Sequence, residues 1–178
     1  SLKGVFMSSY KIGIFTGFIV AFIFLFIISF KKKCINEYDE RQMMIRGRGY
    51  SYAFYVVLIL GILYGIFQED FPQIIPPGVV IIIILFLSVT VLCTYLIFND
   101  AYWGYKYHKF KTYFIFYIAM FITNLIQPVK VLAENRMFIN GILQYTGILP
   151  LIVSIFFLYM AVILSIKTFI DKKNRDAE

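Results

Sequence analysis

Long apolar runs without a single charge are the feature of this sequence that most limits what the chain can fold into. The first such run, residues 12–30, contains no Asp, Glu, Lys, Arg or His. At about 1.5 Å of rise per residue, a helix of this length crosses the ~30 Å hydrocarbon layer of a membrane. Every backbone N–H and C=O group in that layer needs a partner within the chain, so the run predicts a helix and not a strand.

Four further apolar runs follow, at residues 52–67, 79–98, 113–132 and 148–166. Hydrophobic residues make up 61% of the 178 residues, against roughly 45–50% in soluble domains. No polar segment is long enough to form a separate soluble domain. The sequence therefore predicts an all-α integral membrane helical bundle, with five transmembrane helices in a single domain over residues 1–178.

Lys and Arg residues near span ends are retained on the cytoplasmic side, so their distribution predicts the orientation. With the amino terminus outside, thirteen of the 17 basic residues fall on inner segments and four on outer ones. We therefore predict that the amino terminus lies outside and the carboxyl terminus inside. Because the basic residues lie at span ends, the net charge of +7 indicates contact with anionic membrane lipids and not with nucleic acid.

The connector after the first run, KKKCINEYDERQMMIRGRGY, concentrates charge between two uncharged segments. Asn36 is a typical helix cap, and acidic residues follow it in the first turn, where they complement exposed backbone donors. We predict a short cytoplasmic helix over about residues 37–46. Gly47 and Gly49 are then expected to end this helix and return the chain to the membrane.

Two pairs of glycines stand four residues apart, Gly13 with Gly17 and Gly61 with Gly65. Small residues at this spacing let helix backbones approach closely in membranes. The pairs predict packing of the first span against the second. Formation of a homo-oligomer through one pair is the alternative.

Aromatic residues gather near the predicted inner interface, where amphipathic rings favour the headgroup level. This belt comprises Tyr50, Tyr52, Tyr55, Tyr102, Trp103, Tyr105, Tyr107 and Tyr113. The alternative is that some of these rings line a shallow cytoplasmic pocket with Asp39, Arg41, Asp100 and His108.

Several kinds of chemistry are missing from the sequence. Apart from Lys130, the predicted spans contain no ionisable residue of the kind that marks ion paths, which disfavours an ion-coupled transporter. No glycine-rich phosphate loop is present. One histidine and two separated cysteines do not suffice for a usual metal site. We therefore assign no catalytic residue, metal or cofactor.

Two polar clusters remain, DERQ with the two arginines that follow it, and NDAYWG after the third run. Both are predicted to face the cytoplasm. The candidate residues for binding a partner or ligand are Asp39, Glu40, Arg41, Arg46, Arg48, Asp100, Tyr102, Trp103 and His108. The alternative is a purely structural clasp, in which an acid of one cluster pairs with an arginine of the other.

The same residues carry a resemblance. The pattern DERQ with RGRGYSYAFY after the first span, and NDAYWGYK after the third, resembles an uncharacterised family, a domain of unknown function, of small multi-spanning membrane proteins from Gram-positive bacteria. The resemblance extends from about residue 37 to the basic tail through short motifs. It implies a multi-pass protein of the bacterial cytoplasmic (inner) membrane, and it implies no catalytic role for any residue.

These observations favour a non-enzymatic accessory or regulatory membrane protein that presents a cytoplasmic polar surface to a partner protein. One alternative is a binder or carrier of a lipid or small amphiphile between aromatic-rich helices. A second alternative is a membrane-embedded enzyme acting on lipid headgroups, for which acid, base or metal groups must converge. The sequence leaves open whether residues 138–147 re-enter the membrane or lie on its surface.

Overall fold

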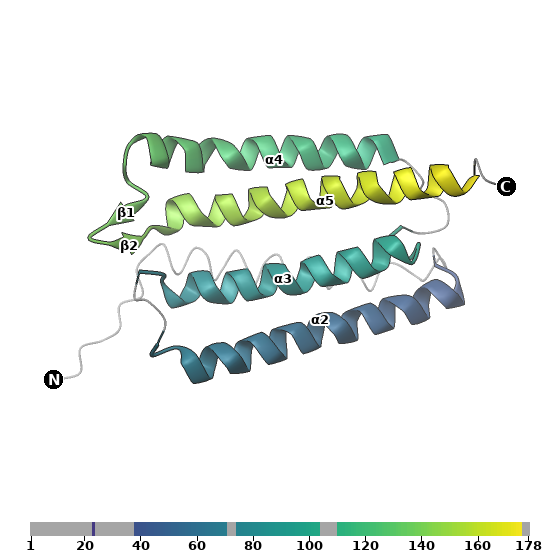
Figure 1. Ribbon diagram of the computed structural model, residues 1–178, viewed down its shortest axis with the longest axis horizontal. Coiled ribbons are helices and arrows are strands. Elements are labelled where there is room, and N and C mark those ends of the chain that lie inside the picture. Colours follow the sequence, from purple (N-terminus) through teal and green to yellow (C-terminus); the bar gives the residue numbers. More distant parts are fainter. Residues whose placement is uncertain (1–22, 24–37, 71–73, 104–109, 176–178) are drawn as a thin grey trace. The chain divides into compact units, whose positions relative to one another are not determined.

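The computed structural model describes residue 23 and residues 38–70, 74–103 and 110–175, which are mostly helical (Figure 1). From Tyr38 onward these residues belong to one compact unit. Its elements are helices α2 (Glu40–Phe67), α3 (Pro77–Phe98), α4 (Phe110–Ala133) and α5 (Tyr145–Arg175), and strands β1 (Phe138–Ile139) and β2 (Ile142–Leu143).

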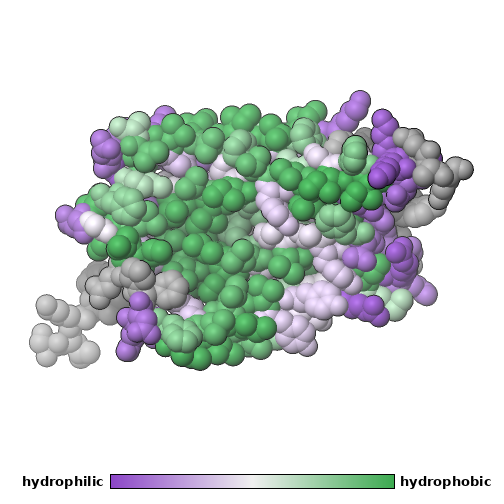
Figure 2. Space-filling view, in the orientation of Figure 1, coloured by the Kyte–Doolittle hydropathy of each residue, from purple (hydrophilic) through white to green (hydrophobic). Residues whose placement is uncertain are grey.

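All four described helices are long and apolar enough to cross a membrane. They contain the predicted second to fifth spans and extend beyond them at their ends. The first predicted span, residues 12–30, lies outside the described residues apart from Ile23. Figure 2 shows apolar side chains over the middle of the helices and hydrophilic side chains at their ends, as expected for a multi-pass membrane protein.

Helix α2 corrects the prediction of a separate connector helix. The expected helix over residues 37–46 is present from Glu40, but its predicted end at Gly47 and Gly49 is wrong, because α2 continues without a break to Phe67. Its cap is Asp39 and not Asn36. At Gly49 the two helices come close, since a Cβ there would lie 3.0 Å from the Leu92 side chain of α3.

The helices pack in the order α2, α3, α5 and α4, each against the next. One cluster of buried side chains forms where α3, α4 and α5 meet, and it includes Ile97, Tyr117 and Met160. A smaller cluster joins Ile45 of α2 to Leu96 and Ala101. Hydroxyl groups add bonds between helices, since Ser88 donates to the carbonyl oxygen of Ala53 and Ser154 to that of Phe121. Helix association in lipid relies on such packing and polar contacts.

The packing predicted for the two glycine pairs is not tested by the described residues. Among the described residues, a Cβ added at Gly61 or Gly65 would meet nothing within 4 Å. Their proposed partners Gly13 and Gly17 lie outside the described residues, so packing between these pairs stays a prediction. The close approach between α2 and α3 occurs at Gly49 instead.

Residues 138–147 form a small hairpin followed by the start of α5. Strands β1 and β2 are antiparallel, with Phe138 opposite Leu143. Asn140 and Gly141 both have positive φ, 52° and 75°, as a tight two-residue hairpin turn requires. The backbone N–H of Leu143 donates to the carbonyl oxygen of Ile74, which ties the hairpin to the segment before α3.

Candidate functional site

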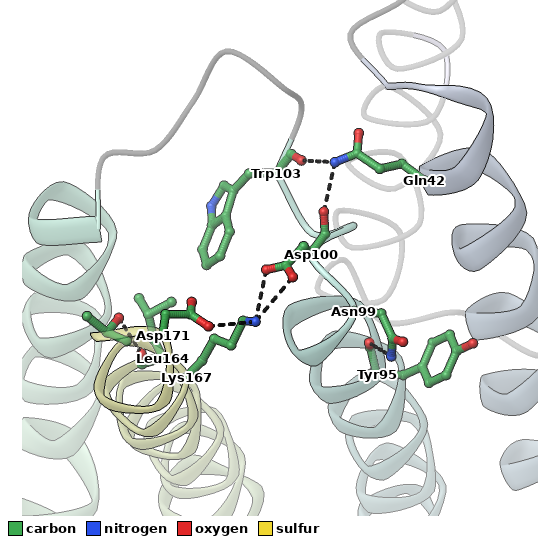
Figure 3. Close-up of polar contacts among 9 residues, drawn as sticks. Gln42, Tyr95, Asn99, Asp100, Trp103, Leu164, Lys167 and Asp171 are labelled. Carbon is green, nitrogen blue, oxygen red and sulfur yellow. Dashed lines mark hydrogen bonds and ion pairs between the residues drawn. The ribbon is translucent and has the colours of Figure 1, made fainter. Parts of the chain in front are cut away.

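The residues of the two sequence motifs meet at one end of the described helices. This end, which we call the motif end, contains the first turns of α2, the segment Asn99–Trp103 after α3 and the last turns of α5. Figure 3 shows the polar contacts that join these three elements. The clasp is our name for the contacts that Asp39, Gln42, Arg46, Asp100, Lys167 and Asp171 make at this end.

The clasp begins with the cap of α2. Asp39 accepts a hydrogen bond from the backbone N–H of Gln42 at 2.6 Å, and the Gln42 side chain accepts one from the backbone N–H of Asp39. These reciprocal bonds form a capping box, which satisfies two backbone donors left free at a helix start. The box also holds the Gln42 side chain in one place.

Gln42 is buried and connects α2 to the segment after α3. Its amide nitrogen donates to the carbonyl oxygen of Asp100 at 2.7 Å and lies 3.5 Å from that of Trp103 (Figure 3). One turn further on, Arg46 donates to the carbonyl oxygen of Ala101 at 3.2 Å. The Arg46 guanidinium also lies 4.2 Å from the centre of the Tyr38 ring, a favourable cation–π distance.

The segment after α3 presents these carbonyl groups because of how the helix ends. Asp100 adopts a left-handed conformation with φ of 56°. The N–H of Ala101 donates to the carbonyl oxygen of Leu96, and that of Asp100 to the carbonyl oxygen of Ile97. These two bonds define a Schellman motif, in which glycine is the usual left-handed residue. Ala101 and Leu96 complete the motif by packing together.

The side chain of Asp100 points to the other side of the clasp (Figure 3). The Lys167 ammonium of α5 lies 3.0 Å from one Asp100 carboxylate oxygen and 2.9 Å from Asp171, one turn further along α5. The Lys167 side chain is only 13% exposed. Two carboxylates therefore compensate a largely buried cation, and α5 is joined to the segment that α2 also binds.

Tyr102 and Trp103 turn inward from the same segment. The Tyr102 hydroxyl lies 3.0 Å from that of Tyr117 and also contacts the Cys93 thiol, and burial raises its pKa. The Trp103 ring packs edge-on against Tyr102 and tilted against Tyr113. Its indole nitrogen is buried and has no hydrogen-bond partner among the described residues. These rings are partly buried in the core cluster, unlike Tyr50, Tyr52 and Tyr55, which are exposed.

The structure divides the candidate residues into three groups. Asp39, Arg46 and Asp100 belong to the clasp, and Tyr102 and Trp103 pack inward. Glu40, Arg41 and Arg48 are exposed. His108 lies outside the described residues.

The expected pairing of an acid in one motif with an arginine in the other does not occur among the described residues. Asp100 instead pairs with Lys167, and Arg46 binds a backbone carbonyl group. Sequence reasoning missed Gln42 and Lys167. Gln42 could have been found from its spacing three residues after Asp39, which is typical of a capping box. Lys167 stands four residues before Asp171, but its contact with Asp100 has no sequence signal.

No family model, curated protein or solved structure matches this chain. Within the ranges that the structure describes, no three His, Cys, Asp or Glu side chains gather to hold a metal ion.

Proposed function

We propose that this chain is a non-enzymatic accessory or regulatory protein of a bacterial cytoplasmic membrane, with five spans and the motif end in the cytoplasm. Its motif end binds a partner protein. The proposed orientation rests on the distribution of basic residues described above.

The clasp supplies a rigid base for such a surface. Gln42 and Arg46 bind the segment after α3, and Lys167 binds the same segment from α5. Side chains that are held by neighbouring contacts lose less conformational entropy when a partner binds. In this proposal the clasp residues position the surface and the exposed residues contact the partner.

The observation that carries the proposal is a stripe of exposed side chains on the first turns of α2. Arg41, Met44 and Arg48 follow each other at helical spacings of three and four residues, so they share one face. Met44 is 63% exposed and its neighbour Met43 is 59% exposed. Arginine and methionine are enriched at protein interfaces, and methionine adapts to irregular partner surfaces. Neither arginine has an ion pair or hydrogen bond among the described residues.

The length of α2 supports a position of this stripe beyond the apolar layer. Its 28 residues span about 42 Å, roughly 12 Å more than the ~30 Å hydrocarbon layer. The apolar part of α2 is its carboxyl-terminal part, so the extra length lies at the motif end. The last turn of α5 adds exposed Lys172, Lys173 and Arg175. The complementary partner therefore presents acidic side chains around an apolar contact for the methionines.

The test compares two variants in native membranes. A photoreactive amino acid replaces Met44, and in a second protein it replaces Leu132, which is equally exposed near the other end of the helices. Crosslinking to one partner protein is expected at residue 44 only. The double variant Arg41→Glu with Arg48→Glu should reduce recovery of that partner about tenfold or more, as expected for charge reversal at an interface. Lys130→Glu, an exposed charge near the opposite end, should leave it unchanged.

A chain that isolates from mild detergent with no second polypeptide would contradict the proposal, as would equal recovery of the partner with the double variant. Orientation is tested separately with Arg41→Cys and Glu134→Cys in a Cys34→Ser background. A membrane-impermeant maleimide should label residue 134 in intact cells and residue 41 only after permeabilisation. Labelling of residue 41 in intact cells would place the motif end outside and refute the proposal.

A further inference from the structure

A groove of about 400 Å³ lies on the last turns of α3, apart from the clasp. Residues of α3 between Thr90 and Phe98 supply most of its lining, together with Asn99, the cap of α3, and Tyr159 of α5. The core cluster packs against other residues of α3, Cys93 and Ile97, which do not line the groove. The groove volume falls near the lower end of the roughly 300–1,000 Å³ range of small-molecule sites.

The hydroxyl groups of Thr90, Thr94 and Tyr159 in the groove have already donated their hydrogens. Thr90 donates to the carbonyl oxygen of Phe86 and Thr94 to that of Thr90, both at 2.7 Å. Because a hydroxyl has one hydrogen, the 2.8 Å contact between Thr94 and Tyr159 requires Tyr159 to be the donor. The oxygens of all three side chains are therefore left as acceptors.

Asn99 lies at the end of the groove that is nearest the motif end. Its amide nitrogen donates to the carbonyl oxygen of Tyr95 at 2.8 Å, which leaves the side-chain carbonyl oxygen as an acceptor. Asn99 stands five residues after Thr94, so the positions of these two acceptor residues are separated by about 8 Å along the helix axis. A ligand that matches this arrangement carries more than one hydroxyl donor.

The remaining lining residues, Val91, Tyr95 and Phe98, are uncharged. Val91 and Phe98 are 38% and 40% exposed, and none of the described residues that line the groove is acidic or basic. An ionic headgroup would lose hydration here without gaining a counter-charge. The ligand is therefore neutral, with a hydroxyl-bearing head at the Asn99 end and an apolar chain that extends toward Val91.

We propose that this groove binds one monoacylglycerol, a neutral lipid with two hydroxyl donors and a single acyl chain. One hydroxyl donates to the side-chain oxygen of Asn99 and the other to the Tyr159 oxygen beside Thr94, and its chain lies on Phe98 and Val91. One chain fits the small volume better than the two chains of a diacylglycerol. The groove serves a different ligand from the motif end, so this proposal does not depend on the proposed partner.

Native mass spectrometry of the full chain in detergent tests the proposal with 1-monooleoylglycerol as the probe. The comparison ligands are the same ester with both hydroxyls methylated, and oleoyl lysophosphatidate, which carries a charged head. One bound monooleoylglycerol per chain is expected. Both comparison ligands should bind about tenfold more weakly, because one loses its donors and the other buries a charge.

Two variants of α3 locate the site. Val91→Trp fills the groove and should reduce binding of monooleoylglycerol about tenfold or more, since it removes the space for the chain. Val89→Trp is the matched control, because Val89 is similarly exposed at 42% on the same helix and does not line the groove. It should retain binding within about twofold. Both proteins are compared after size-exclusion chromatography shows the same single species as the wild type.

Equal binding of the methylated ester and monooleoylglycerol would overturn the proposed hydroxyl recognition. Equal binding by Val91→Trp and the wild type would overturn the assignment to this groove. If Val91→Trp does not yield a single species, Tyr159→Phe replaces it. That change removes an acceptor at the rim of the groove and should weaken binding about threefold or more, the effect of one hydrogen bond. Unchanged binding by Tyr159→Phe would likewise count against the site.

Discussion

Replacing Gln42 should reveal how much the clasp contributes to stability. The side chain is 8% exposed, and its amide donates at 2.7 Å to the carbonyl oxygen of Asp100. In Gln42→Ala this part-buried hydrogen bond is lost, at a cost of about 0.5–1.5 kcal/mol. The variant also loses half of the capping box. We expect a decrease of about 2 kcal/mol in the free energy of unfolding.

Thermal unfolding in detergent provides the assay. For a chain of this size, 1 kcal/mol corresponds to about 2–4 °C, so Gln42→Ala should lower the Tm by about 4–8 °C. Trp103 is the single tryptophan of the chain, and its carbonyl group also faces Gln42. Its fluorescence therefore reports on the clasp directly.

Two control variants separate the possible causes. Gln42→Met fills a similar volume but cannot donate, so it should lose most of the same stability if the hydrogen bond matters. Arg41→Ala changes an exposed neighbour and should alter stability by less than about 0.5 kcal/mol. A Tm for Gln42→Ala within about 1 °C of that of Arg41→Ala would refute the reasoning. Loss of the Gln42 hydrogen bonds should lower the Tm by several degrees more than the exposed substitution does.

Three further pairs of variants test other parts of the structure by the same unfolding assay. Asp100→Ala should lower stability by about 1–2 kcal/mol because alanine is strained at positive φ, whereas Asp100→Gly should recover most of this loss; equal stability of the two variants would contradict the Schellman assignment. Gly49→Val should cost about 1–3 kcal/mol through overpacking, whereas Gly47→Val, where a Cβ meets nothing within 4 Å, should change stability by less than about 0.5 kcal/mol; equal effects would refute the proposed close contact. Burial raises the pKa of Tyr102, so the folded protein favours the neutral hydroxyl. The free energy of unfolding should therefore be retained below the ordinary tyrosine pKa of about 10 and should fall as the pH rises above it. Tyr102→Phe should reduce this loss and the exposed control Tyr52→Phe should not, so equal pH profiles would contradict the assignment.

The sequence by itself was sufficient to predict the helices within the described residues. The apolar runs at residues 52–67, 79–98, 113–132 and 148–166 all lie within helices, because the requirement to satisfy backbone groups in an apolar layer applies whatever the helices pack against. Pro77 at the first position of α3 is a local start signal of the same kind. Asp39 and Gln42 form another local start signal, although the sequence analysis predicts the cap at Asn36.

Only the tertiary structure decided which glycine approaches a neighbouring helix and which polar residues meet. Gly49 lies where α3 comes close to α2, since a Cβ there would lie 3.0 Å from the Leu92 side chain. Lys167 finds Asp100 across 67 positions of sequence, and Tyr102 and Trp103 turn into the core although they have the composition of an interfacial belt. The physical reason is common to all three. Local propensities and backbone satisfaction act over one helical turn and can be read along the chain, whereas side-chain burial and charge pairing depend on which helix faces are brought together.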